Sequence, residues 1–156
     1  MLEQRVRRPA DKEELIARLA GDSPNALFPS VRHLFVFAAA LAKVEGKGVP
    51  PADSSPDAIR LELFQRESGH ELLIQMLAVL EYKDDLEILE EDRAAQRVEI
   101  FEQYVNGGLE ILQAHFNANR QARDDDALQL LVDQYLDRQK PEGGVDLTRY
   151  ADELGL

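Results

Sequence analysis

Cysteine and tryptophan are both absent from the 156-residue sequence. Without cysteine the chain forms no disulfide, no thiolate nucleophile and no cysteine-based zinc site. Long apolar runs are missing too, since the longest, LFVFAAALA at 34–42, is far shorter than the roughly 20 residues of a membrane-spanning helix. The opening residues, MLEQRVRR, lack the apolar centre of a secretory signal. We therefore expect a cytoplasmic protein that does not enter membranes.

Positive charge is scarce. The chain has 18 Lys and Arg against 30 Asp and Glu, and its net charge is −12. This balance argues against a broad electrostatic grip on DNA or on an anionic membrane, because such binding depends on neutralising phosphates. The exception is a local group at Arg5, Arg7 and Arg8, which offers contacts to phosphate or to an acidic partner protein. The interpretation we favour is that these arginines pair with the chain's own surplus of carboxylates.

Helical periodicity accounts for most of the chain. In several segments apolar residues recur three and four positions apart, which gives a helix one apolar face. The segments 29–46 and 69–82 are apolar on nearly every side, as is typical of helices buried at the centre of a domain. Asp11 is the expected N-cap of the first helix. The expected helices cover 11–20, 29–46, 69–82, 92–119 and 126–139, with short pieces at 84–89 and, after an N-cap at Asp146, at the end of the chain.

The remaining segments are less regular. Residues 1–10 read as a short strand or an ordered arm, and 47–57, rich in Pro, Gly, Ser and Asp, reads as a loop. Alternating apolar residues favour a short extended segment within 58–67, although a helix beginning at its start is the alternative. The predicted fold is mainly α: a compact multi-helix domain of about six helices, with two buried central helices and a minor β element. This domain covers 1–140, and 141–156 form a short linker and helix.

A pair of glycines, Gly107 and Gly108, interrupts the longest predicted helix. Each costs about 1 kcal/mol relative to alanine in a helix interior. The apolar positions nevertheless keep their phase across the pair, as one continuous helix requires. The pair leaves a notch at one level of the helix, which another helix backbone or a large side chain can enter, and we prefer this packing role to a hinge or a ligand seat. The apolar positions are Val98, Phe101, Val105, Leu109, Leu112 and Phe116.

The histidines do not form a metal-binding pair along the sequence. GHELL at 69–73 begins like a zinc-hydrolase helix, but Ile74 stands where the second histidine would be. We expect His33, His70 and His115 to be ordinary helix residues. No catalytic residue, metal ligand or cofactor is assigned from the sequence.

A loose PD…ExK pattern of metal-dependent nucleases is present at Asp57, Glu81 and Lys83. In such nucleases the two acids hold Mg²⁺ and the lysine orients the attacking water. Glu81 and Lys83 would then lie on a strand, where residues two apart share a face, but here they end a predicted helix. A nuclease is therefore the third-ranked interpretation.

Two phrases carry a resemblance to a known family: LFPSVRHLFVFAAALA at 27–42 and EIFEQYVNGGLEILQ at 99–113. Together with the opening RVRRPADKEELIARL, they resemble DNA phosphorothioation-associated protein 4, a Dnd-system-associated family. The likeness covers residues 5–116. It implies an accessory product of bacterial systems that modify DNA with phosphorothioate or restrict unmodified invaders. It carries no catalytic motif.

The first-ranked function is thus a non-enzymatic accessory or adaptor protein of a DNA phosphorothioate modification or restriction system, with a role in phage defence. It would act through contacts to a protein component of that complex, and the candidate interface is an exposed apolar patch on the helices of 126–156. The last helix also offers a surface for a homodimer. The alternative is an acidic DNA mimic or regulator, whose carboxylates imitate phosphates in the groove of a DNA-binding enzyme.

Overall fold

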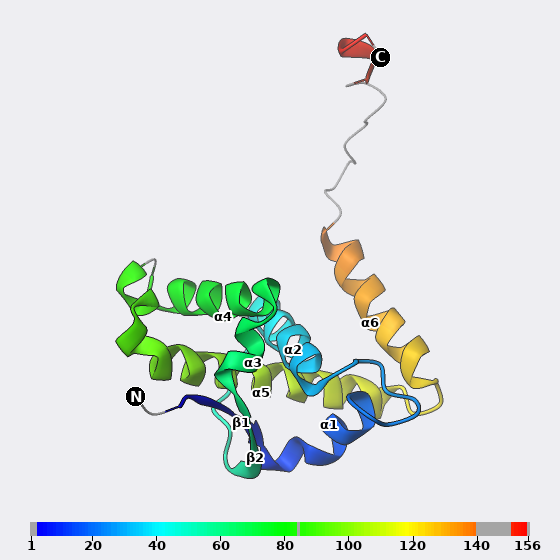
Figure 1. Ribbon diagram of the computed structural model, residues 1–156. Coiled ribbons are helices and arrows are strands. Elements are labelled where there is room, and N and C mark those ends of the chain that lie inside the picture. Colours follow the sequence, from blue (N-terminus) through cyan, green and yellow to red (C-terminus); the bar gives the residue numbers. More distant parts are fainter. Residues whose placement is uncertain (1–2, 84, 140–150, 156) are drawn as a thin grey trace.

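The computed structural model describes residues 3–83, 85–139 and 151–155. Its described part is mainly α with one small antiparallel sheet, which confirms the predicted fold class. The labelled elements of this part are six α-helices and two strands, and residues 151–153 form a further short helix (Figure 1). Their order is β1 (Arg5–Pro9), α1 (Glu13–Leu19), α2 (Val31–Glu45), β2 (Ser54–Arg60), α3 (Leu61–Gln65), α4 (Ser68–Glu81), α5 (Ala94–Ala118) and α6 (Asp124–Gln139). Short 3₁₀ turns lie at Ala10–Lys12, Leu86–Leu89 and Glu91–Arg93.

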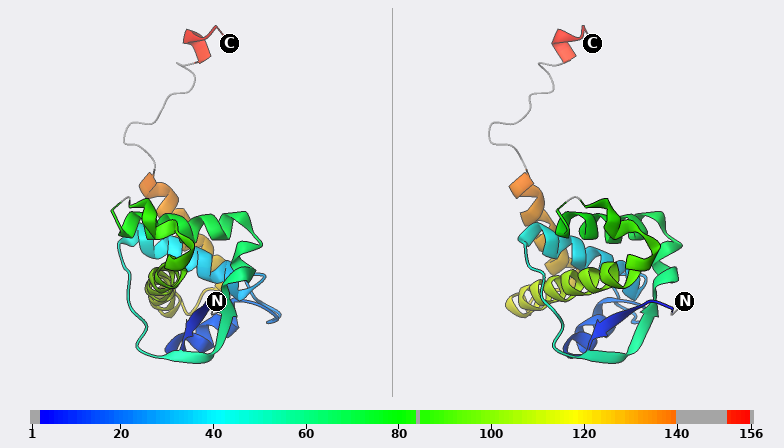
Figure 2. Two further views of the ribbon diagram at one scale, coloured as in Figure 1. Left: turned by 60° about the vertical axis from the view of Figure 1, so that its left-hand side comes forward. Right: turned by 90° about the vertical axis from the view of Figure 1, so that its left-hand side faces the viewer.

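The long helix α5 lies at the centre of the molecule. It runs through the middle, with α2 and α4 on one side and the β1–β2 sheet on the other (Figures 1 and 2). Its 25 residues form one helix across the glycine pair, as the unbroken apolar phase predicted. The largest fully buried side chains of the core include Phe35, Leu34, Phe64, Leu77, Phe101, Leu109 and Leu112.

Helix α2 has clear start and stop signals. Ser30 is its N-cap, and the Ser30 hydroxyl accepts a hydrogen bond from the backbone N–H of His33. Gly46 ends the helix in the left-handed conformation, at φ 65°, which glycine adopts without the steric cost of a side chain. The prediction of a helix over 29–46 is therefore confirmed to within two residues.

Helix α4 differs from the prediction of a second fully buried helix. Ile74, Leu77 and Ala78 are buried, but Leu72 and Met76 are 55% and 50% exposed. Leu80 lies on the same outer row as Leu72 and Met76 and is also about half exposed. An all-apolar sequence cannot reveal which face of a helix lacks a neighbour. Here α4 packs against α5, α3 and α2, and the row of Leu72, Met76 and Leu80 stays exposed.

The small sheet corrects two expectations. Strand β2 begins at Ser54, inside the segment expected to be a loop. The extended segment expected within 58–67 is confirmed at 58–60, where it belongs to β2, but the chain turns into helix α3 at Leu61. Antiparallel pairing with β1 places Val6 opposite Ile59 and Arg7 opposite Ala58. The position of β2 is determined by its pairing with β1, some fifty residues earlier in the chain, and the local composition does not reveal that pairing.

The first helix also begins later than expected. Asp11 is not its N-cap: it lies in the preceding 3₁₀ turn, and α1 starts at Glu13 after Lys12. The Asp11 carboxylate instead accepts a hydrogen bond from Lys12 Nζ at 2.8 Å. Asp11 thus binds the Lys12 side chain and does not cap the backbone N–H groups of α1.

At the other end of the chain, α6 packs beside α2, and its Tyr135 and Arg138 bind Glu45 at the end of α2. The predicted linker and terminal helix at 141–156, with the expected cap Asp146, fall mostly outside the described residues; residues 151–153 are helical. None of the described helices combines the length and the apolar character needed to cross a membrane.

Candidate functional site

The N-terminal arginines are bound to the chain's own carboxylates. Arg7 donates from Nε to Glu102 Oε2 and from Nη2 to Glu102 Oε1, both at 2.9 Å, and its backbone N–H donates to Oε2 at 2.6 Å. Glu102 is only 3% exposed. The hydrogen bonds to this carboxylate raise the pKa of Arg7 above its usual value. Arg7 therefore anchors β1 to α5.

Arg8 and Arg5 have partners as well. Arg8 pairs with Glu13 through two hydrogen bonds of 2.9 and 2.7 Å, and Arg5 pairs with Glu3 at 2.8 Å. Half of the Arg5 side chain is exposed, whereas that of Arg8 is mostly covered. These pairs match the internal pairing that we favoured, and contact of the arginines with phosphate or a partner stays a prediction.

A polar row, buried at Glu102 and Asn106 and partly exposed at Glu110, continues along α5 beside the apolar core. Glu102, Asn106 and Glu110 are spaced four apart, so they lie on one helix face. Lys12 is 6% exposed, and its Nζ atom lies 3.4 Å from Asn106 Oδ1 and 3.9 Å from Glu110 Oε1. Asn106 Nδ2 also donates to the carbonyl of Val49 at 3.1 Å. The sequence-based prediction missed this row, although the four-residue spacing of its three polar residues can be read from the sequence.

The glycine pair lies where two segments come closest to α5. A Cβ atom on Gly108 would overlap the carbonyl oxygen of Ala38 and lie 2.7 Å from its Cα. A Cβ atom on Gly107 would overlap the carbonyl oxygen of Lys47 and lie 2.9 Å from its carbonyl carbon. Both neighbours are backbone, which cannot rotate away as a side chain can.

The nuclease pattern is not assembled. Asp57 lies in β2, on the opposite side of α5 from helix α4 (Figures 1 and 2). Glu81 is the last residue of α4, and its carboxylate accepts a hydrogen bond from the Tyr104 hydroxyl at 2.8 Å. Lys83 follows α4 with a positive φ of 55°. The three residues therefore offer no common Mg²⁺ site.

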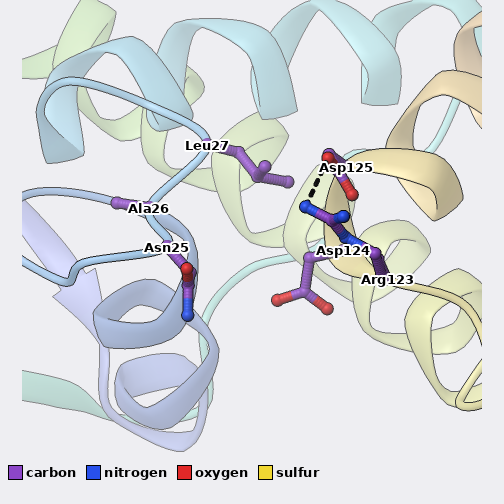
Figure 3. A pocket seen from close by; sticks show the side chains of 6 residues that line it. All are labelled: Asn25, Ala26, Leu27, Arg123, Asp124 and Asp125. Carbon is purple, nitrogen blue, oxygen red and sulfur yellow. Dashed lines mark hydrogen bonds and ion pairs between the residues drawn. The ribbon is translucent and has the colours of Figure 1, made fainter.

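A polar hollow of about 540 Å³ opens between the loop after α1 and the start of α6 (Figure 3). Its charged side chains have partners: Arg123 pairs with Asp125 at 3.3 Å, and Asp124 accepts a hydrogen bond from Arg18 Nε at 2.9 Å. The hollow thus presents paired charges rather than an isolated acid or base. It is lined by Asn25, Ala26, Leu27, Arg123, Asp124 and Asp125.

A second hollow is apolar and lies between α2 and α6. We call it the α2–α6 groove; its volume is about 200 Å³. Val44 and Leu136, which lie along it, are 60% and 57% exposed. At its end the carboxylate of Glu45 accepts hydrogen bonds from Tyr135 and Arg138, at 2.6 and 2.7 Å. The groove is lined by Phe37, Ala40, Leu41, Val44, Leu131, Val132, Tyr135 and Leu136.

The residues that could hold a metal ion are not the acids of the nuclease pattern. His33, Glu67 and His70 each place one donor atom within 4.8 Å of the others. His33 Nε2 and His70 Nε2 lie 3.4 and 3.1 Å from the same carboxylate oxygen, Oε2 of Glu67. The sequence spacing gave no sign of this group, because His33 comes from a different helix.

The described residues therefore form a mainly helical protein with an open apolar groove and a small histidine–carboxylate cluster. A family model described as DNA sulphur modification system-associated protein 4 matches residues 5–150, and the chain belongs to this family. The match confirms the resemblance found in the sequence, extends it beyond residue 116 and links the chain to a DNA sulphur modification system. No curated protein and no solved structure gives a significant match.

Proposed function

We propose that this protein is a non-enzymatic accessory component of a DNA sulphur modification system, and that it works by binding another protein of that system. Membership of a system-associated family supports the link to the system. The observation that carries the binding proposal is the α2–α6 groove, because its lining is apolar and open to solvent.

The groove suits one apolar face of a partner helix. Its two walls are helices, so the ridge of a third helix can lie between them and be buried on both sides. Burying apolar surface contributes about 25 cal/mol per Å². Contiguous exposed apolar surface is typical of protein interaction sites and binding grooves. Half of the groove belongs to α6, within the segment where the sequence analysis placed the candidate interface.

The accessory role is preferred to a nuclease because Asp57, in β2, lies across α5 from Glu81 and Lys83 at the end of α4 (Figure 1). The DNA-mimic alternative predicts a different salt dependence of binding. A mimic binds through carboxylates, so its affinity falls steeply with salt, whereas contact through the groove is mainly apolar and changes little.

Co-purification tests the proposal. The tagged protein is expressed together with the proteins of a DNA sulphur modification system, and the recovered complex is identified by mass spectrometry at low and high salt. We expect a stoichiometric protein of that system whose recovery persists in high salt. Recovery of the chain as a monomer or homodimer alone overturns the adaptor role, and salt-sensitive capture of a DNA-binding enzyme favours the mimic.

A matched pair of variants locates the contact. Leu136→Asp places a charge in the α2–α6 groove, and Leu72→Asp places one at a similarly exposed position on α4. Because an unpaired charge in an apolar contact costs at least about 1–3 kcal/mol, Leu136→Asp should weaken binding about tenfold or more. Leu72→Asp should leave it unchanged. The reverse pattern would place the partner on the outer row of α4 and contradict the groove as the binding surface.

A further inference from the structure

Three donor atoms converge where helices α2 and α4 begin. His33 lies in the first turn of α2, His70 lies in the first turn of α4, and Glu67 immediately precedes α4. Both imidazole Nε2 atoms face one carboxylate oxygen, Oε2 of Glu67, at 3.4 and 3.1 Å. The two rings meet edge to face, with their centroids 4.9 Å apart. Two imidazoles and one carboxylate thus point toward a common region.

The local structure holds these donors in place. Glu67 occupies the N-cap position of α4, but its side chain makes no capping hydrogen bond and turns toward the two rings instead. Ser30 Oγ lies 2.7 Å from Nδ1 of His33, which leaves Nε2 as the nitrogen that faces Glu67. A partner on the second ring nitrogen is what fixes the orientation of histidines that bind metals.

The spacing fits a tetrahedral ion. With bonds of about 2.0–2.2 Å to nitrogen and oxygen, the donors of a tetrahedral zinc site lie about 3.3 Å apart. The two observed N···O distances, 3.1 and 3.4 Å, bracket that separation. Three protein donors leave a fourth position for water. Water has access, because a third of the His33 side chain and 44% of the Glu67 side chain are exposed.

The Nδ1 atom of His70 is buried and has no hydrogen-bond partner among the described residues. The ring therefore meets Glu67 through Nε2, the atom that would bind the ion.

We propose that His33, Glu67 and His70 bind one divalent transition-metal ion of the zinc class per chain. Imidazole nitrogen selects such ions over Mg²⁺ and Ca²⁺, which prefer oxygen ligands. The ion would join the first turns of α2 and α4, which lie far apart in the sequence. This site is independent of the protein-binding role proposed above.

Positive charge near the site limits its affinity. Arg32 Nη2 lies 3.9 Å from the other carboxylate oxygen of Glu67, Oε1, and the amino-terminal ends of two helices also carry partial positive charge. Both weaken the attraction of Glu67 for a cation. The site therefore binds Zn²⁺ more weakly than a closed structural site with four protein ligands.

Zinc titration of the purified full chain tests the site. Isothermal calorimetry and metal analysis after dialysis should give one Zn²⁺ per chain, with Mg²⁺ failing to compete. His33→Gln, Glu67→Gln and His70→Gln should each lower the affinity more than tenfold. Glu71→Gln, four positions further along α4, removes a carboxylate outside the cluster and should leave the affinity within twofold of the wild type. Equal binding by all these variants, or no binding by the wild type, overturns the site.

A measurement on the unmodified chain covers the case in which a variant fails to fold. Imidazole ¹⁵N signals of His33 and His70 should shift on addition of Zn²⁺. The ring of His115, whose Nε2 contacts the carbonyl of Ala127 at 2.6 Å, lies outside the cluster and serves as the internal reference. A shift of His115 alone, or of no ring, contradicts the proposal.

Discussion

Gly108 lies directly against the backbone of Ala38, so closely that a Cβ atom on the glycine would overlap the alanine carbonyl oxygen. Helix α2 and helix α5 therefore meet backbone to backbone at this level. We propose that this close approach is the role of the glycine pair, because tight helix contact offsets the poor helix propensity of glycine through dispersion contacts along both helices.

Gly108→Ala is the direct test of that role. At an open helix position this change stabilises a protein by up to about 1 kcal/mol, because alanine is the better helix former. Here the added methyl group must push α2 away from α5, so we expect a loss of about 3 kcal/mol, at the upper end of overpacking costs. Urea unfolding followed by circular dichroism measures the difference.

Gly69→Ala is the matched control, because a Cβ atom on Gly69, in the first turn of α4, meets nothing within 4 Å. It should leave stability unchanged or raise it slightly. If Gly108→Ala were as stable as Gly69→Ala, close packing would not explain the pair, and a hinge or ligand seat would become the better interpretation.

Arg7→Ala should destabilise the fold far more than Arg5→Ala. Arg7 neutralises Glu102, which is 3% exposed, whereas Arg5 pairs with the exposed Glu3. Removing one partner of a fully buried ion pair costs about 3–5 kcal/mol. Because the Arg7 side chain is itself about half exposed and water screens the pair, we expect about 2 kcal/mol for Arg7→Ala. Arg5→Ala should cost less than about 1 kcal/mol.

Thermal and urea unfolding of the two variants provides the comparison. Equal, small losses for both would mean that Arg7 does not hold β1 to α5, and its guanidinium would then be available to phosphate or a partner. The double variant Arg7→Ala/Glu102→Gln removes the unpaired charge and should recover part of the loss.

How far the sequence predicts this molecule depends on the range of each signal. Helix α5 was predictable because its apolar residues repeat at short, regular intervals and maintain one face through Gly107 and Gly108. The ends of α2 were predictable because Ser30 and Gly46 act on the turns next to them. Strand β2 was predictable only at 58–60, where apolar residues alternate; its first half looks like a loop, because its partner β1 lies some fifty residues earlier.

The range of the signal along the sequence also explains which site residues were predicted and which were missed. The internal pairing of Arg7 followed from the excess of carboxylates, but its partner Glu102 depends on how β1 crosses α5. The histidine cluster was invisible because His33 and His70 come together only where α2 and α4 begin. Patterns of side chains along one helix are local information, whereas contacts between elements are not.

We expect Tyr104 to make the stability of the fold fall in alkali. Burial, together with the hydrogen bond to Glu81, raises the pKa of Tyr104 to about 12. A phenol whose pKa is higher in the folded than in the unfolded chain stabilises the fold fully below pH about 10, and this contribution is lost as the pH rises toward 12. Tyr104→Phe should therefore flatten the decline in stability between pH 10 and 12.

Absorbance at 295 nm, where phenolate absorbs, checks the assignment. The Tyr104→Phe variant should lack part of the absorbance change near pH 12, while the part from Tyr135, whose pKa is also raised to about 12, remains. If the absorbance change near pH 12 were the same in Tyr104→Phe and in the wild type, Tyr104 would not ionise near that pH.

Glu45→Ala should loosen α6 without disturbing the centre of the fold. The Glu45 carboxylate, at the end of α2, accepts hydrogen bonds from both Tyr135 and Arg138, and these bonds, the one from Tyr135 first, lower the pKa of Glu45. Without them the later half of α6 keeps its apolar contacts along the α2–α6 groove, while Arg18 still binds Asp124 at the start of the helix. Amide hydrogen exchange should become faster in α6 and stay unchanged in α5, because local opening needs only the contacts that hold α6.

Glu87→Ala, in an exposed 3₁₀ turn away from α6, is the control for a lost surface carboxylate and should leave the exchange of α6 unchanged. Lowering the pH should act on wild type in the same direction as Glu45→Ala. A carboxyl group with a lowered folded-state pKa contributes its stability above the unfolded pKa, and that contribution disappears as the pH falls through the folded value. If exchange in α6 were insensitive to both changes, the Glu45 contacts would not hold this helix, and the groove would owe its shape to apolar packing alone.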